Sequence, residues 1–261
     1  MRQSAWRDPG VPKLRAMSEE ADEYGGVSIS EIDDRFAVFP DPTAVFVADQ
    51  QDLARLMHPL VSIDLAAVDP TWTGRVHLIS PVDPEYGAVE DESGAYAGAE
   101  SNGAWLTFRM QEDGRWRFVG DVRVLAVAAD AARGDDEAVA RIAEVNADFA
   151  ASRGRWQQYG ILSYGDPDDP TRPRVGAASG PLIDQFGGTP PDGNWVVGEP
   201  PAGLELDQSD TDVPVLRLAD GRPFHFIAAT SGYPWRWHGA DAILLFFEPE
   251  TRTAVLTFDF S

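Results

Sequence analysis

The fold class of this chain is decided by the stretch Ala242-Ile243-Leu244-Leu245-Phe246-Phe247-Glu248-Pro249-Glu250-Thr251-Arg252-Thr253-Ala254-Val255-Leu256-Thr257-Phe258-Asp259-Phe260. The first six residues are apolar at every position, which is typical of a strand with neighbours on both sides and cover on both faces. After the polar turn 248–252, residues 254–260 alternate between apolar and polar side chains, which predicts a second strand with one buried face. We therefore expect a C-terminal β-hairpin whose first strand lies inside a sheet.

Further strand signals lie on the N-terminal side of this hairpin. Residues 224–229 predict the strand that precedes it. Residues 104–110 and 115–119 predict an earlier hairpin, because Asp113-Gly114 between them suits the positive φ angles of a tight turn. Shorter runs rich in β-branched and aromatic residues predict additional strands at 44–48, 60–65, 75–79 and 122–128.

The strongest helix signal spans 135–152. Acidic residues at 135–137 suit the positive end of a helix dipole. The apolar residues Val139, Ile142, Val145 and Phe149 recur at near-helical spacing and predict one buried stripe, and Gly154 is placed to end the helix. A shorter helix is expected at 50–57, stopped by His58-Pro59.

These elements predict an α+β fold with β-rich mixed or antiparallel sheets and few helices. We divide the chain into a flexible lead-in (1–26), an N-terminal β-rich half (27–132), a linking helix (133–154) and a C-terminal β-rich half (155–261), packed as one compact unit. Both halves contain two apolar strands separated by a polar gap and a glycine, so two related halves remain an open alternative.

The chain is strongly acidic, with 43 acidic against 21 basic residues and a formal net charge of -22. Such a surface repels nucleic acid and anionic membranes and attracts basic partners. The acidity could have been selected for such a partner, or it could reflect a GC-rich or salt-adapted genome, which the scarcity of lysine suggests, since Lys13 is the single lysine.

The chain has no cysteine, which excludes disulfides and thiolate ligands. With neither an apolar leader nor a membrane-length apolar run, we expect a soluble, cytoplasmic protein of undetermined oligomeric state.

The C-terminal region carries a pattern at 226–229, Trp237-His238-Gly239-Ala240-Asp241, 243–250 and 258–261, with weaker matches at 184–190 and 60–65. In these segments the chain resembles the YwqG-like family of uncharacterised bacterial proteins. It departs from the family pattern at His238, which separates Trp237 from Gly239, and at Asp241, which follows Ala240. The resemblance implies a β-rich α+β fold with related halves, and it implies no activity.

One loop concentrates side chains suited to binding. The candidates are Tyr233, Trp235, Arg236, Trp237, His238 and Asp241. Tryptophan, tyrosine and arginine dominate binding hot spots, so a ligand site is one interpretation. The other is a loop that closes over the core with Arg236 paired to an acid.

Two acidic clusters are candidates for docking a basic partner. Their members are Asp166, Asp168, Asp169, Asp207, Asp210 and Asp212. Neither cluster has the ligand spacing of a calcium loop, so solvated loops are the alternative. The four histidines lack metal-site spacing, and no nucleophile or phosphate-loop motif is present, so we expect no metal, no cofactor and no identifiable catalytic residue.

Three functional hypotheses follow. The first is a non-enzymatic binding protein for a basic protein, for example an immunity-type protein that neutralises a cationic toxin. The second is a hydrolase-like enzyme with a pocket under loop 231–239, in which His238 and Asp241 are the polar groups and Trp235 and Trp237 the walls. The third is a small-molecule or carbohydrate binder that uses the same aromatic residues.

Overall fold

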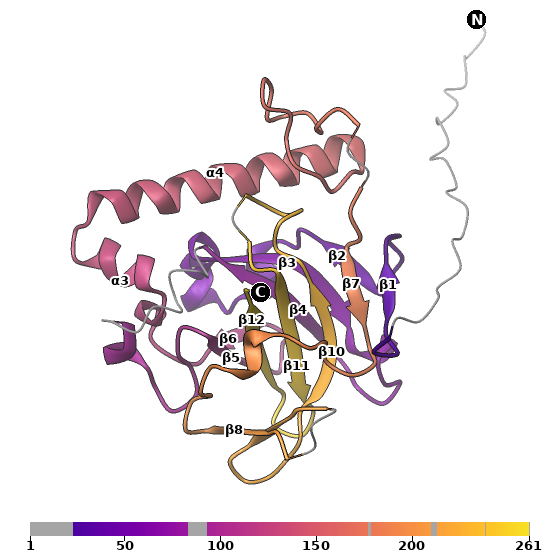
Figure 1. Ribbon diagram of the computed structural model, residues 1–261, viewed down its shortest axis with the longest axis vertical. Helices are drawn as coiled ribbons and strands as arrows, with labels where there is room; N and C mark the ends of the chain where they lie inside the picture. Colours follow the sequence, from indigo (N-terminus) through magenta and orange to yellow (C-terminus); the bar gives the residue numbers. More distant parts are fainter. Residues whose placement is uncertain (1–22, 83–92, 177–178, 210–212, 238, 261) are drawn as a thin grey trace, which may run out of the picture.

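An antiparallel seven-stranded sheet forms the centre of the computed structural model, with strand order β1-β7-β10-β11-β12-β5-β6 (Figure 1). The structure describes residues 23–82, 93–176, 179–209, 213–237 and 239–260. The strands of this sheet are β1 (Val27–Ile29), β5 (Trp105–Met110), β6 (Trp116–Phe118), β7 (Ile183–Phe186), β10 (His225–Thr230), β11 (Ala242–Glu248) and β12 (Thr253–Asp259). The predicted α+β, β-rich fold class is confirmed, and the predicted C-terminal hairpin, β11–β12, lies near the middle of the sheet.

Strand β11 is buried on both faces, as its sequence predicts. Ile243, Leu245 and Phe247 enter the main hydrophobic core, whereas Leu244 and Phe246 enter a second core on the opposite face. The prediction of one buried face for β12 is wrong, because every residue of that strand is buried. The 3₁₀ segment η5 (Asn194–Val196) covers its polar face, and Asn194 donates its backbone N–H to the Asp259 carboxylate over 2.8 Å.

Each face of the central sheet has its own cover. On one face lies a three-stranded sheet of β2 (Phe36–Val38), β3 (Met57–Asp64) and β4 (Arg75–Pro81), in which β4 packs against β10, β11 and β12. On the other face, the hairpin of β8 (Leu204–Asp207) and β9 (Val215–Leu218) packs with η5 over the second core. The middle of the sheet, at β11 and β12, is therefore covered on both faces.

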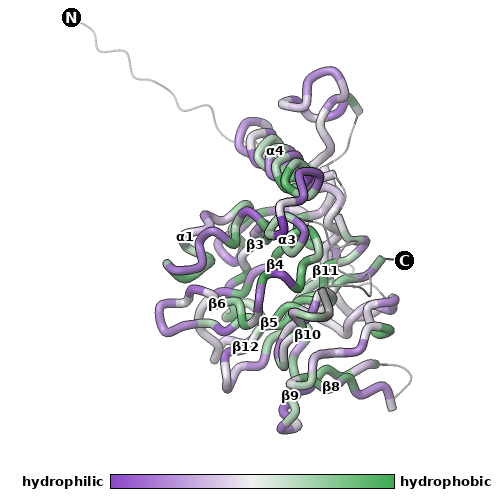
Figure 2. The backbone as a smooth tube through the Cα atoms, turned by 90° about the vertical axis from the view of Figure 1, so that its left-hand side faces the viewer, coloured by the Kyte–Doolittle hydropathy of each residue, from purple (hydrophilic) through white to green (hydrophobic). Residues whose placement is uncertain are grey.

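The long helix α4 (Asp136–Tyr159) lies along one end of the β structure, opposite β8 (Figures 1 and 2). Asp135 caps it by accepting the N–H groups of Glu137 and Ala138. The helix passes through Gly154 and ends at Gly160, whose φ of 64° suits a glycine cap, so the predicted end was too early. Val139 is 51% exposed and does not belong to the buried stripe.

The remaining elements are short helical segments. They are α1 (Pro42–Val45), η1 (Ala48–Arg55), η2 (Leu65–Ala67), η3 (Ser93–Tyr96), η4 (Val122–Val124) and α3 (Ala126–Ala132). The strands predicted at 44–48 and 122–128 are wrong, since short apolar runs do not distinguish strand from buried helix. The helix predicted at 50–57 is present as η1, which ends at Arg55, and the His58-Pro59 pair expected to stop it lies beyond that end in β3, with a bulge between Pro59 and Val61. Within the described residues, no helix combines the length and apolar character required to cross a membrane.

The central sheet combines strands from both predicted halves of the chain. β5, from the range 27–132, pairs with β12 on one side and with β6 on the other, and β1 pairs with β7. The boundary drawn at 133–154 therefore does not separate two sheets. Of the predicted lead-in, residues 1–22 lie outside the described part of the chain.

Two histidines are buried in the β3–β4 pair. His58 stacks on Phe149 of α4 at 4.2 Å, and its Nε2 lies 3.3 Å from the Asn146 side-chain oxygen. His77 Nδ1 lies 2.7 Å from the Ser62 hydroxyl. Burial, together with the smaller effect of a nearby arginine (Arg236 for His58, Arg75 for His77), lowers the pKa of both imidazoles to about 3. Both are therefore neutral in the folded protein.

We predict that stability falls as the pH drops below the ordinary histidine pKa. The unfolded chain gains protons on both imidazoles while the folded chain does not, so together they lower the free energy of unfolding by about 2–3 kcal/mol between pH 7.5 and 5.5. Urea unfolding at those two pH values measures this loss. H77Q should remove about half of it, and an equal pH dependence in wild type and H77Q would contradict the account.

Candidate functional site

The predicted binding loop between β10 and β11 is closed by a narrow backbone neck. Gly232 donates its N–H to the Ala240 carbonyl over 2.9 Å. A Cβ added at Gly239 would lie 2.3 Å from the Gly232 carbonyl carbon, so the two chain segments approach too closely for a side chain there. This neck holds the two ends of the loop side by side.

Two of the predicted binding residues point into the protein. Trp235 has no exposed surface and packs edge-on against Phe39, with ring centroids 5.1 Å apart. Arg236 is 1% exposed and donates to the carbonyls of Pro81 and Val82 at the end of β4. These residues fix the loop to the core, and neither is available to a ligand at the surface.

Trp237 faces outward and is 57% exposed. Its ring lies edge-on to that of Tyr164, with centroids 5.4 Å apart, and its backbone N–H donates to the Asp148 carboxylate of α4. Tyr233, which is partly buried, lies near enough to Tyr164 to raise the pKa of that hydroxyl, although burial of Tyr164 is the larger cause. His238 lies outside the described residues.

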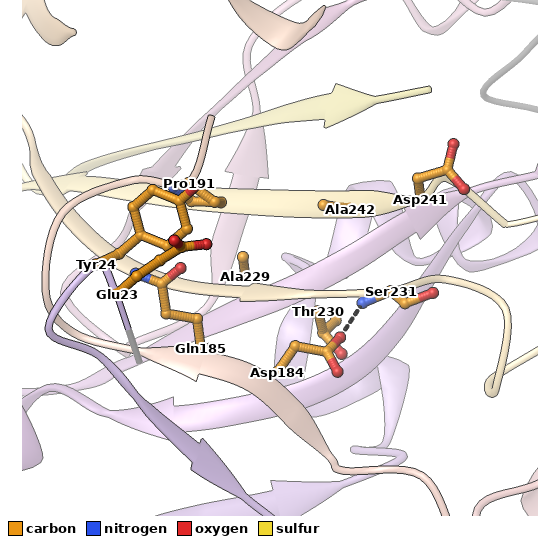
Figure 3. Close-up of a pocket in the computed structure, with 10 residues that line it drawn as sticks. All are labelled: Glu23, Tyr24, Asp184, Gln185, Pro191, Ala229, Thr230, Ser231, Asp241 and Ala242. Atoms are coloured by element: carbon orange, nitrogen blue, oxygen red, sulfur yellow. Dashed lines mark hydrogen bonds between the residues drawn. The ribbon is translucent and has the colours of Figure 1, made fainter. Parts of the chain in front are cut away.

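A pocket of about 450 Å³ opens at the base of this loop, at the ends of β7, β10 and β11 (Figure 3). Its lining residues are Glu23, Tyr24, Asp184, Gln185, Pro191, Ala229, Thr230, Ser231, Asp241 and Ala242. Glu23 and Tyr24 lie at one side and Asp241 at the other, with Asp184 between them (Figure 3). Asp241 is thus part of a concave site, whereas the two tryptophans expected as its walls are not.

The side of the pocket formed by Glu23 and Tyr24 is positioned by a close backbone contact. Gly188 has φ 76°, and a Cβ there would lie 2.4 Å from the Tyr24 carbonyl oxygen. Thr189 donates its N–H to the same oxygen over 2.9 Å. The buried Gln185 side chain donates to the carbonyls of Gly187 and Thr189, which holds the turn in place. Glu23 and Tyr24 are thereby held beside β7.

Asp184 has the most unusual environment among the acids of the pocket. Its residue is open to solvent on one side, yet the surrounding protein displaces enough water to raise the pKa of the carboxyl group. Hydrogen bonds from the Ser231 N–H and the Thr230 hydroxyl act in the opposite direction and only partly offset this. The carboxylate would therefore be stabilised by a cation that enters the pocket.

The pocket acids have no ion-pair partner, a property that they share with many other acids of the surface. Ion pairs join many of the arginines to nearby acids, and four of these pairs follow an Asp-x-Arg pattern: Asp33–Arg35, Asp113–Arg115, Asp121–Arg123 and Asp220–Arg222. Within the described residues, Glu23, Asp184 and Asp241 form no ion pair. What distinguishes them from other unpaired acids, such as Asp52 and Glu112, is that they line one concavity.

The two predicted acidic clusters contain both paired and unpaired acids. Asp169 pairs with Arg172 at 3.2 Å and Asp207 with Arg217 at 3.9 Å. Asp166 and Asp168 form no ion pair within the described chain. They lie in a turn that the buried Arg155 holds through the carbonyls of Ser163 and Pro170, over 3.2 and 2.6 Å. Asp210 and Asp212 lie outside the described residues.

The chemistry open to this arrangement is recognition of positive charge. In the part of the chain that the structure describes, no group of three or more His, Asp or Glu side chains is placed to hold a metal ion. The lining offers carboxylates, one tyrosine ring and apolar patches from alanine and proline. Carboxylates satisfy ammonium or guanidinium groups, and the apolar surfaces accommodate an alkyl stem.

Sequence reasoning missed Glu23, Tyr24, Asp184 and Tyr164. Asp184 alternates with buried residues of β7, a pattern that a longer strand would have revealed. Tyr24 and Tyr164 reach their positions through contacts more than sixty residues away in sequence, for which local patterns give no signal.

Comparisons with known proteins give no relative from which a role could be transferred. No family model, no curated protein and no solved structure matches the chain. The resemblance to the YwqG-like family stays a prediction, and the site itself is the basis on which we infer a function.

We predict opposite outcomes for the two neighbouring tryptophans. W235A should lower the free energy of unfolding by about 3–5 kcal/mol, because it empties a fully buried site. W237A should change it by less than about 1 kcal/mol, because that side chain is largely exposed. Urea unfolding of both variants measures the difference, and equal costs would contradict the inward and outward assignment.

Proposed function

We propose that this chain is a non-enzymatic binding protein for a basic protein partner, and that the pocket at the ends of β7, β10 and β11 receives a lysine or arginine side chain of that partner. The observation that carries the proposal is the gathering of Glu23, Asp184 and Asp241 in one concavity, without an ion pair among the described residues. A bound cation would take the place of the missing counter-charge.

The electrostatics of the whole chain support the same partner class. With a net charge of -22, the protein attracts a basic molecule over a Debye length of roughly 8–10 Å. Such steering raises association rates by roughly 10–10³-fold at low salt. The uncompensated Asp166 and Asp168 offer a second acidic contact on the turn beyond α4.

One specific version of the proposal is an immunity-type protein that covers the active site of a cationic toxin, such as a nuclease, in the cytoplasm. A toxin-like reading frame beside the gene would favour this version. The general proposal requires only that the partner present a basic side chain to the pocket.

A small-molecule binder is the second candidate, favoured by the size and concavity of the pocket. A free cationic metabolite would then occupy the site that we assign to a side chain. The hydrolase-like alternative has less support: the pocket contains Ser231, but its hydroxyl accepts the Tyr233 N–H over 3.3 Å, and no histidine lines the pocket among the described residues.

The test uses two variants with equal changes of charge. D184N/D241N removes two pocket carboxylates, and D52N/E112Q removes two exposed acids elsewhere that have no ion pair among the described residues. The probe is a peptide of four Lys-Gly-Gly repeats, titrated calorimetrically at 20 and 200 mM NaCl, concentrations chosen to span about a threefold change in Debye length.

We expect the pocket variant to bind the peptide about tenfold more weakly than wild type at low salt, and the control variant to remain within about threefold. Equal losses in both variants would mean that the peptide senses only the total charge, and the proposed pocket would be rejected. Tight binding of free lysine amide, comparable to that of the peptide, would favour the small-molecule alternative.

A further inference from the structure

A second recognition feature lies on the outer side of the same loop, where two aromatic rings meet at the surface. Trp237 leaves 57% of its surface in solvent although its loop is anchored by buried neighbours. Tyr164 lies edge-on to it, at 5.4 Å and 65°. An edge-to-face pair leaves the face of one ring uncovered by the other.

A carboxylate is hydrogen-bonded to one residue of this aromatic pair. The Asp148 carboxylate accepts the Trp237 backbone N–H through one oxygen, and its charge contributes, after burial and Tyr233, to the raised pKa of the Tyr164 hydroxyl, so it lies near both aromatic residues. Arg155 is a positive charge in the same region, but it is buried and engaged with two backbone carbonyls, and no ion pair joins it to Asp148 within the described residues. An exposed indole and a neighbouring carboxylate therefore meet at one point of the surface.

The base of the site is rigid. Tyr164 accepts the Arg174 N–H through its carbonyl over 2.9 Å, and Arg155 holds the adjacent Ser163. Trp237 follows Trp235 and Arg236, which are both buried. The two rings are thus held by separate anchors before any ligand arrives, which lowers the entropy cost of binding.

We propose that Trp237, Tyr164 and Asp148 form an arginine clamp, in which a partner's guanidinium group stacks on the exposed indole and donates hydrogen bonds to the Asp148 carboxylate. The inference rests on the proposed function, since it assigns a second basic side chain of the same kind of partner to a second place. The net charge of -22 makes a cationic occupant the complementary one.

Arginine suits this site better than lysine. A guanidinium group is planar, so it stacks on an aromatic face while its N–H groups remain free to reach a carboxylate in the same plane. An ammonium group is a strongly hydrated point charge and gains less from the ring. The clamp therefore predicts selectivity between two cations of equal charge, which a diffuse acidic surface does not provide.

The experiment is ¹⁹F NMR on the full chain labelled with 5-fluorotryptophan, in which the W237F variant assigns the Trp237 signal. The probes are three peptides, Gly-Gly-Arg-Gly-Gly, Gly-Gly-Lys-Gly-Gly and a third in which citrulline, the neutral isostere of arginine, occupies the central position. The signals of Trp235 and Trp105, which have no exposed surface, are internal controls.

We expect a saturable shift of the Trp237 signal with the arginine peptide, about three- to tenfold weaker apparent affinity for the lysine peptide, and little response to citrulline. D148N and Y164L should each weaken the arginine response by a similar factor. Equal responses to arginine and citrulline, or a Trp237 signal that does not move, would overturn the clamp.

The pocket variant separates this inference from the proposed function. D184N/D241N should keep the Trp237 response to the arginine peptide, because those carboxylates line a different site. If wild type binds lysine repeats through the pocket while Trp237 ignores arginine, the clamp fails and the proposed function stands. If Trp237 discriminates arginine while the pocket variant matches its charge control, the clamp stands without the pocket.

Discussion

The burial of β11 on both faces is the constraint on which the arrangement of this protein depends. Its odd-numbered apolar residues enter one core and its even-numbered ones enter another, so two separate layers must cover the central sheet. The β2–β3–β4 sheet supplies one layer and the β8–β9 hairpin with η5 supplies the other. Because both faces are occupied, recognition chemistry is confined to the strand ends, where β7, β10 and β11 give way to loops and the pocket opens.

The surplus of acid is organised by local pairing. An Asp-x-Arg turn brings carboxylate and guanidinium together and also lets the aspartate accept the arginine backbone N–H, as between Asp121 and Arg123. Such exposed pairs add little stability. They neutralise only part of the acidic surface, and many acids remain without an ion-pair partner within the described residues. Glu23, Asp184 and Asp241 are unpaired acids that line the same pocket, so negative charge is concentrated there.

The sequence predicts the elements whose signals are long and periodic. The β11–β12 hairpin, the 105–118 hairpin and most of α4 are readable because apolar periodicity extends over several residues. The 122–128 segment is helical, and the sequence could not decide this because a short apolar run fits either state.

The site was only partly predictable: Asp241 and Trp237 are in the expected loop, but Tyr24, Asp184 and Tyr164 join them through tertiary contacts. Trp235, Arg236 and Trp237 are neighbours with the same expected role in the sequence, and only tertiary contacts show that Trp235 packs on Phe39 and Arg236 binds the end of β4 while Trp237 faces outward.

The pKa of the Asp184 carboxyl group tests the central claim, which is that the unpaired carboxylates of the pocket bind a cation. Carboxyl ¹³C NMR of the full chain follows the titration of this group, assigned with D184N, with and without the lysine-repeat peptide. The account predicts a pKa above the ordinary aspartate value in the free protein, because the site is poorly hydrated, and a lower pKa with peptide bound, because a cation favours the ionised form. A pKa at or below the ordinary value that the peptide leaves unchanged would contradict it.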